Sequence, residues 1–183
     1  MIQVLDKHFE PYLKKEDIQR QIERLANEMA MEYAGKNPVF VAVLNGSFMF
    51  ASDLFKSIKF NAEICFIKLA SYKGTKSSGQ VVSVIGLEMM LKDRHVVVIE
   101  DIVDTGRTLT HFLPELENQQ PASLRLCTLL HKPEATVFPL QLDYIGFSIP
   151  NRFVVGYGLD YDGFGRNFPE IYQLAEGVKE PAH

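Results

Sequence analysis

The sequence predicts an α/β protein whose central, mostly parallel sheet is flanked by helices on both faces. Short, nearly continuous apolar runs recur along the chain, which is typical of strands buried on both faces. These runs alternate with segments of helical periodicity, which favours a parallel sheet covered by helices. The 183 residues suffice for one well-buried domain and are too few for two ordinary domains with a linker, so residues 1–183 are expected to form a single domain.

The first predicted helix spans residues 16–33 and ends before Gly35. Its apolar positions recur at steps of three and four, which places them on one face. These positions are Ile18, Ile22, Leu25, Met29 and Tyr33. The run VFVAVLNG, which follows Pro38, predicts a strand ending in an Asn-Gly turn, and residues 48–58 predict a second helix.

Six further strands and one helix are predicted in the rest of the chain. The strands are expected at residues 62–69, 81–85, 95–102, 123–130, 144–149 and 153–157. Between the first two lies SYKGTKSSG, residues 71–79, whose polar and glycine content indicates a mobile loop. A helix containing Leu109 and Leu116 is expected to follow residue 108, and Pro114 is expected to kink or split it.

Composition and charge disfavour several classes of protein. The net charge is -4 and no block of lysine and arginine occurs, so no nucleic-acid partner is expected. The charged first twenty residues and the short apolar runs predict neither a signal peptide nor a membrane span, which favours a cytoplasmic enzyme. Cys65 and Cys127 lie in separate strand-like runs without metal-ligand spacing, so both are expected to be reduced core thiols.

The run VVVIEDIVDTGRT, residues 96–108, carries the strongest functional pattern. Glu100 and Asp101 follow its apolar strand, at the edge where open parallel sheets bind ligands. The turn that follows comprises Thr105, Gly106, Arg107 and Thr108. The backbone amides of this turn, at a helix N-terminus, suit a phosphate dianion, and Gly106 permits the unusual backbone angles. Because two adjacent carboxylates can hold ribose hydroxyls, directly or through Mg²⁺, the pattern predicts a site for a ribose 5-phosphate.

The common alternatives to a ribose 5-phosphate site fit the sequence less well. An isolated Asp-x-x-Asp at a helix start is ordinary helix capping. A Walker loop would also bind phosphate after a strand, but the string G-x-x-x-x-G-K-[ST] does not occur. The segment GYGLDYDGFG has the wrong glycine spacing for a dinucleotide fingerprint, and no helical pattern follows it.

Residues 96–108 resemble the phosphoribosyl pyrophosphate signature of the type I phosphoribosyltransferases: an apolar strand, two acids, two apolar residues and Asp-Thr-Gly-x-Thr. Four more segments occur in the order found in the hypoxanthine-guanine phosphoribosyltransferases, namely residues 41–54, 69–81, 129–134 and 143–167. The resemblance implies the type I fold, with a small hood formed by the N-terminal segment and roughly residues 150–183. It also implies that Glu100 and Asp101 serve the ribose hydroxyls and Mg²⁺, and that the turn at 105–108 binds the 5-phosphate.

The resemblance also assigns the acceptor to a 6-oxopurine. Lys132 offers only donors, so it suits the 6-oxo group of hypoxanthine or guanine and opposes the amino group of adenine. Phe153 is expected to stack on the purine. The main chain of Val154 and the side chain of Asp160 are expected at the base edge and the metal hydration shell. Asp104, also in the ribose site, is expected to take the proton from purine N7.

Further residues are expected to serve the leaving pyrophosphate and to exclude water. The planar guanidinium of Arg166 suits pyrophosphate, and the Asn45 and Gly46 amides are expected to bind it as well. Many family members have lysine in place of Asn45, and the peptide before that lysine can be cis. Ser71 and Tyr72 match the family's closing loop, which implies a lid over a reactive, oxocarbenium-like sugar.

The expected activity is therefore purine salvage: transfer of the phosphoribosyl group to N9 of hypoxanthine, and also of guanine, to give IMP or GMP and pyrophosphate. A nucleotide-sensing regulatory protein on the same fold is the alternative of another class. A phosphoribosyltransferase for adenine or a pyrimidine is disfavoured by Lys132 and by the carboxyl-terminal segment. A homodimer or homotetramer is expected, and the preference among hypoxanthine, guanine and xanthine stays open.

Overall fold

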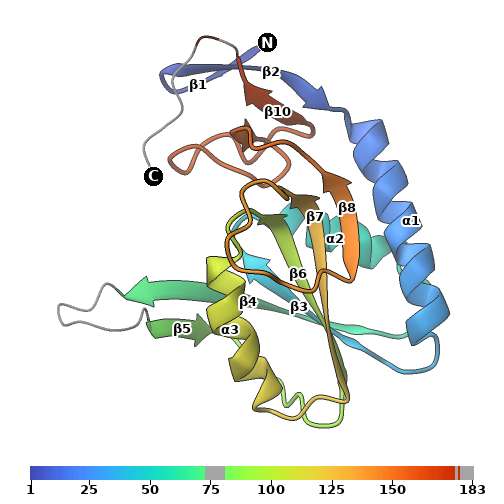
Figure 1. Cartoon of the computed structure of the whole chain (residues 1–183). Helices are drawn as coiled ribbons and strands as arrows, with labels where there is room; N and C mark the ends of the chain where they lie inside the picture. The colour runs from blue at the N-terminus through green and yellow to red at the C-terminus, as the bar shows by residue number, and fades with distance from the viewer. Residues whose placement is uncertain (73–80, 176, 178–183) are drawn as a thin grey trace.

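The computed structural model describes residues 1–72, 81–175 and 177 (Figure 1). Its main sheet has six strands in the order β5-β4-β3-β6-β7-β8, and all neighbours are parallel except β5, which runs antiparallel to β4 at one edge. These strands are β3 (Val39–Leu44), β4 (Glu63–Tyr72), β5 (Val81–Ile85), β6 (His95–Val103), β7 (Ser123–His131) and β8 (Tyr144–Ser148). The predicted α/β class with a mostly parallel sheet is confirmed.

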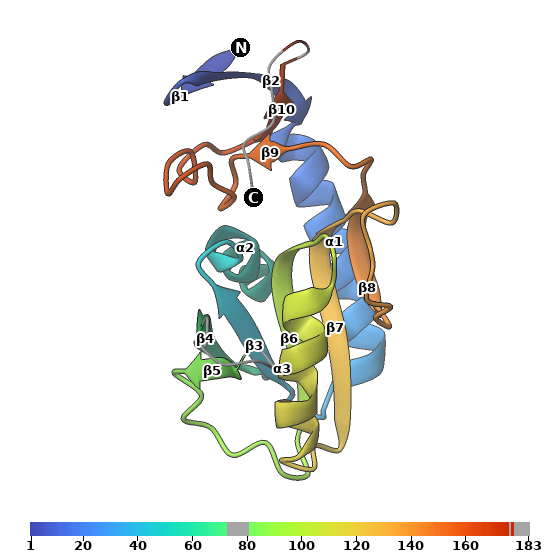
Figure 2. The same cartoon turned by 60° about the vertical axis from the view of Figure 1, so that its left-hand side comes forward.

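Helices cover both faces of this sheet (Figures 1 and 2). They are α1 (Lys15–Tyr33), α2 (Phe48–Ser57) and α3 (Arg107–Glu117). Successive residues of β6 point to opposite faces: Val97 and Ile99 join the core beneath α1 and α2, whereas Val96 and Val98 join the core beneath α3. This burial on both sides explains why the strands are nearly continuous in apolar residues.

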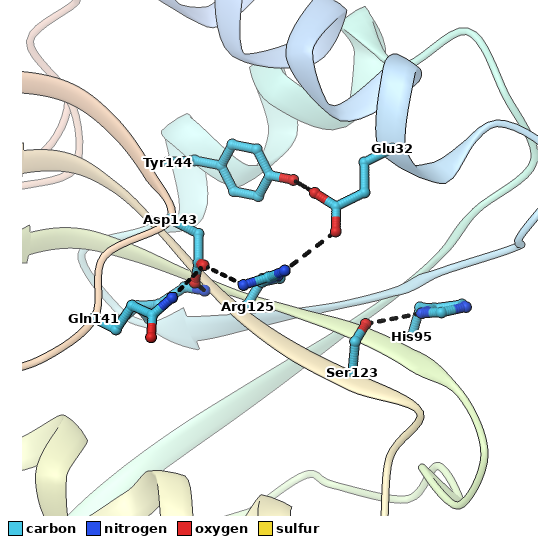
Figure 3. Close-up of polar contacts among 8 residues, drawn as sticks. Glu32, His95, Ser123, Arg125, Gln141, Asp143 and Tyr144 are labelled. Atoms are coloured by element: carbon cyan, nitrogen blue, oxygen red, sulfur yellow. Dashed lines mark hydrogen bonds and ion pairs between the residues drawn. The ribbon is translucent and has the colours of Figure 1, made fainter.

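A polar network fastens the C-terminal end of α1 to the sheet (Figure 3). The Glu32 carboxylate accepts a hydrogen bond from the Tyr144 hydroxyl, and Glu32 Oε1 lies 3.5 Å from Nε of Arg125 on β7. Arg125 Nη1 in turn lies 2.8 Å from Asp143 Oδ1. Arg125 sits near the start of β7, so this network holds α1 in place at the end of the sheet away from the carboxyl ends of the strands.

Helix α3 runs through Pro114 without a break. Proline lacks the N–H that would bond to the carbonyl of Thr110 four residues earlier, so the helix lacks one internal hydrogen bond there. Leu109, Phe112 and Leu116 nevertheless bury one face of α3 against the sheet. The alternative in which Pro114 splits the helix is wrong, because this burial outweighs one missing bond.

The two ends of the chain form a second, antiparallel sheet, whose pairing no sequence pattern predicted. Its strands, in spatial order, are β1 (Ile2–Val4), β2 (Lys7–Leu13), β10 (Ile171–Leu174) and β9 (Val154–Val155). The strand predicted at residues 153–157 is reduced to two residues and belongs to this sheet, because Gly156 turns the chain with a φ of 96°. The sheet lies beyond the carboxyl ends of β6 and β7 (Figure 1).

Cys65 and Cys127 are both free thiols, as predicted. Cys127 is buried in the core beneath α1 and α2, which raises the pKa of its thiol and leaves it unreactive. Among the helices of the described part of the chain, none is long and apolar enough to cross a membrane.

Candidate active site

The end of β6 brings two adjacent carboxylates into a largely desolvated setting. Glu100 Oε2 is buried and has no hydrogen-bond partner among the described residues. Burial, with a contribution from the charge of Asp101, raises the pKa of Glu100 well above its usual range. Burial also raises the pKa of Asp101 to about 6, although its Oδ1 accepts a 2.9 Å hydrogen bond from the Ile102 N–H. These two carboxylates are therefore suited to bind a cation or to accept hydrogen bonds from hydroxyl groups.

The turn after β6 has the geometry predicted for it. Gly106 adopts left-handed backbone angles, with a φ of 79°, and immediately precedes α3. A Cβ at this position would lie 2.5 Å from the carbonyl oxygen of Phe138, so a side chain has no room. A cavity of about 100 Å³ lies at this turn. It is lined by Glu100, Ile102, Val103, Asp104, Thr105, Gly106, Arg107, Thr108 and Leu109.

Asp104 and Lys132 form an ion pair beside this cavity. Each follows the end of a strand, β6 and β7, and the strands are paired in register up to Val103 and His131. Lys132 Nζ lies 3.2 Å from Asp104 Oδ2, and the Lys132 residue is only 6% exposed. A lysine that follows a strand is usually solvated, and the burial of Lys132 is therefore unusual. It places the Lys132 ammonium, a hydrogen-bond donor, beside the Asp104 carboxylate next to the cavity.

The loop between β3 and α2 approaches the same strand end. The peptide bond between Leu44 and Asn45 is cis. At Gly46, a Cβ would lie 1.6 Å from Asp101 Oδ2, so the glycine backbone is in direct contact with that carboxylate. Gly158 packs against this loop in turn, because a Cβ on Gly158 would lie 2.0 Å from the Gly46 carbonyl oxygen. The Gly46 loop thus packs directly against Asp101, and the Gly158 segment packs against the Gly46 loop.

In the C-terminal segment, two of the predicted site residues, Arg166 and Asp160, form an ion pair with each other. Arg166 Nη2 lies 2.6 Å from Asp160 Oδ1, and Arg166 Nη1 donates to the Gly158 carbonyl over 2.7 Å. The charge of Arg166 lowers the pKa of Asp101 and that of Asp160 raises it, both less than burial does. Val154 lies in β9, where it pairs with Gln173 of β10.

Phe153 is half-buried in an aromatic cluster. Its ring centroid lies 6.2 Å from that of Phe9 and 5.9 Å from that of Tyr161. Both neighbours belong to segments for which no strand or helix was predicted, so the packing on this ring was not foreseen.

The two predicted lid residues, Ser71 and Tyr72, are the last residues of β4, three beyond the predicted strand end. The rest of the predicted lid, residues 73–79, lies outside the described residues. A second cavity, of about 740 Å³, lies between α1, α2 and the C-terminal segment, and none of the predicted site residues lines it. Its walls include Ile18, Phe48, Met49 and Tyr157.

Sequence reasoning missed His131 and Thr136, which lie on either side of Lys132. The Thr136 hydroxyl reaches the backbone carbonyl oxygens of both Asp104 and Lys132, at 3.1 Å and 3.0 Å. No periodicity or motif marks a single threonine in a loop. The segment LLHKPE, which precedes Thr136, was the available signal for a functional residue in this region, and it indicated Lys132 alone.

Comparison with known proteins agrees with this geometry. Residues 8–162 match the family model described as "Phosphoribosyl transferase domain". The chain is 42% identical over 179 residues to the hypoxanthine-guanine phosphoribosyltransferase of Lactococcus lactis, covering 97% of this chain and 94% of the relative. It is 41% identical over 165 residues to the hypoxanthine-guanine-xanthine phosphoribosyltransferase of Tritrichomonas foetus, covering 90% of each chain.

A solved structure gives the same result at the level of the fold. The hypoxanthine phosphoribosyltransferase of Staphylococcus aureus superposes with a TM-score of 0.85 at 40% identity, covering 91% of both chains. The family match, the two relatives and this superposition each span most of the chain. The chain therefore belongs to the hypoxanthine-guanine phosphoribosyltransferases, a family of transferase enzymes with the type I phosphoribosyltransferase fold.

Proposed function

We propose that the protein is a purine-salvage enzyme that transfers the 5-phosphoribosyl group of phosphoribosyl pyrophosphate to N9 of hypoxanthine or guanine. The products are IMP or GMP and pyrophosphate. One observation carries the assignment: the Lys132–Asp104 ion pair stands beside the cavity that the acidic strand end and the phosphate-binding turn enclose. The names of the relatives support the same reaction.

The donor is held at the end of β6. Glu100 and Asp101 bind the ribose hydroxyls, while residues 105–108 hold the 5-phosphate at the N-terminus of α3. The left-handed backbone of Gly106 and the shared cavity support this division. Asp104 stands between the two groups and faces the acceptor.

The acidic residues also fit Mg²⁺. Glu100 Oε2 is buried without a partner among the described residues, and burial raises the pKa of both neighbouring carboxyls, so a divalent cation would relieve their desolvation. Hard oxygen ligands of this kind suit Mg²⁺, with Asp160 near its hydration shell. When bound by these residues, the ion would supply positive charge opposite the departing pyrophosphate.

The acceptor purine contacts the side chains of both Lys132 and Asp104. An ammonium has three hydrogens, so Lys132 can keep its bond to Asp104 while donating to the 6-oxo group of the base. Phe153 stacks on the ring, and the main chain of Val154 with Asp160 borders its edge. Adenine presents an amino group to Lys132, which sets donor against donor.

The reaction exchanges one bond at C1 of the sugar. N9 of the purine attacks C1, the bond from C1 to pyrophosphate breaks, and the N7 proton passes to Asp104. The sugar carries positive charge as it passes between the two partners, and Arg166 with the amides of Asn45 and Gly46 takes up the negative charge that develops on pyrophosphate. Ser71 and Tyr72 belong to the lid that excludes water.

The proposal extends to the second sheet, to the domain organisation and to the oligomeric state. The second sheet, built from both chain ends, acts as a hood over the purine within a single domain of residues 1–183. The protein works in the cytoplasm as a homodimer or homotetramer. No observation among the described residues favours the regulatory alternative.

The test supplies hypoxanthine, guanine, xanthine and adenine separately with phosphoribosyl pyrophosphate and Mg²⁺, and measures pyrophosphate release. Release is expected with hypoxanthine and guanine, and adenine serves as the matched control because it differs at the 6-substituent that Lys132 meets. No turnover with any of the four would overturn the enzyme assignment. A preference for adenine would overturn the role of Lys132.

A further inference from the structure

The Thr136 hydroxyl lies at the junction of three polar groups. Its Oγ1 is 3.1 Å from the Asp104 carbonyl oxygen, 3.0 Å from the Lys132 carbonyl oxygen and 3.2 Å from His131 Nε2. A threonine hydroxyl has one hydrogen, which it can donate to one carbonyl at a time, and lone pairs that can accept from the imidazole. The half-buried hydroxyl therefore joins two strand ends.

The carbonyls reached by this hydroxyl belong to the two residues proposed to handle the purine. Pairing between β6 and β7 ends with the bond from the Lys132 N–H to the Val103 carbonyl, at 2.9 Å. Past that point Asp104 leads into the turn before α3, and Lys132 leads into the loop before β8. The Thr136 hydroxyl reaches the backbone carbonyls of the same two residues whose side chains form the ion pair of 3.2 Å.

His131 is compatible with a hydroxyl hydrogen that points at a carbonyl. Burial lowers the pKa of the imidazole, which favours the neutral ring. When the hydroxyl hydrogen points at a carbonyl, a neutral ring with its hydrogen on Nε2 can donate to Thr136 Oγ1. The histidine thus leaves the hydroxyl hydrogen available for Asp104 or Lys132.

The phosphate-binding turn is supported by a different set of bonds from the same loop. The N–H groups of Val137 and Phe138 donate to the Thr105 carbonyl over 3.1 Å and 3.0 Å. These are backbone bonds, and replacing the Thr136 side chain leaves their donors in place. In this loop, the Thr136 hydroxyl therefore supports the Asp104–Lys132 pair, whereas the backbone N–H groups support the phosphate-binding turn.

We infer that Thr136 is a positioning residue that sets the spacing between Asp104 and Lys132, and that its loss impairs use of the purine but not binding of the donor. The inference rests on the proposed function. Thr136 does not line the cavity at the turn after β6, so it acts through the backbones of the two residues that its hydroxyl reaches.

The experiment compares Thr136→Val and Thr136→Ala, which lack the hydroxyl, with Thr136→Ser, which keeps it. Steady-state kinetics give kcat and the separate KM values for hypoxanthine and phosphoribosyl pyrophosphate, and thermal unfolding gives Tm. Both hydroxyl-free variants are expected to lower kcat/KM for hypoxanthine about tenfold, the upper range for one lost hydrogen bond, while KM for the donor changes less than about twofold. The serine variant is expected to stay within about twofold of the unmodified protein.

Ser57→Ala is the matched control, because the Ser57 hydroxyl also donates to a carbonyl over 3.0 Å but lies at the end of α2, outside the proposed site. It is expected to leave both KM values unchanged. Equal effects on purine and donor, failure of serine to restore activity, or a lower Tm with unchanged kinetics would overturn the inference. Unfolding of both hydroxyl-free variants would overturn it too, since the hydroxyl would then hold the fold. An unmodified protein that uses no purine would overturn the proposed function itself.

Discussion

Replacing Asp101 with asparagine is expected to stabilise the unliganded protein at neutral pH. Asparagine keeps an oxygen that can accept the hydrogen bond of the Ile102 N–H but carries no charge. Burial raises the pKa of Asp101 from 3.8 to about 6, a difference of about 2 pH units, which corresponds to roughly 3 kcal/mol of destabilisation by the charged form. Although desolvation dominates the pKa shift, the Asp101 residue keeps part of its surface in contact with water, so screening reduces the expected gain to roughly 1–2 kcal/mol.

The sign of this effect fixes its pH window. Below about pH 4 the Asp101 carboxyl is protonated in both the folded and the unfolded chain, and the substitution changes little. Between about pH 4 and 6 the unfolded chain loses its proton first, so the folded aspartate form is progressively destabilised. Above about pH 6 the difference is complete. Loss of the Asp101 charge also lessens the rise in the pKa of Glu100, and this smaller rise further stabilises the folded Asp101→Asn protein.

Urea unfolding at pH 4 and pH 7, in EDTA and without substrates, measures the difference between the two proteins. Asp162→Asn is the control, because Asp162 is an exposed aspartate outside the proposed site and its replacement is expected to change stability at neither pH. Adding Mg²⁺ and phosphoribosyl pyrophosphate should reverse the order, since the ligands favour the carboxylate. An Asp101→Asn protein that is equally destabilised at both pH values would refute the reasoning.

Three further substitutions test the rest of the site. Gly46→Ala places a methyl carbon 1.6 Å from Asp101 Oδ2, so the loop must move by more than about 1 Å, and kcat/KM for the donor is expected to fall roughly 100-fold; an unchanged value would contradict the contact. Asp104→Asn is expected to slow single-turnover chemistry roughly 100-fold while the donor Kd changes less than about threefold, and an undiminished rate would remove Asp104 from proton transfer. Lys132→Met removes a charged donor and is expected to raise KM for hypoxanthine roughly 10- to 100-fold, whereas an unaltered KM would exclude contact with the 6-oxo group.

The main sheet was predictable because each of its strands carries its own signal. The run from His95 to Val103 is apolar on both faces, and both faces are buried, so pattern and environment agree. β2 has no such signal: it contains Pro11, and it is paired with β10, more than 150 residues away. Pairing between the two ends of a chain depends on the folded core between them, which no local pattern records.

For the site, local sequence was sufficient wherever chemistry and spacing lie within one short run. The acids at 100 and 101, the left-handed glycine at 106 and the helix that follows it all come from one strand–turn–helix unit. Only the tertiary structure pairs Lys132 with Asp104, presses Gly46 against Asp101 and brings the Thr136 hydroxyl to both strand ends. These contacts join separate loops, and their distances are set by the register of parallel strands and by packing, which act on the folded chain as a whole.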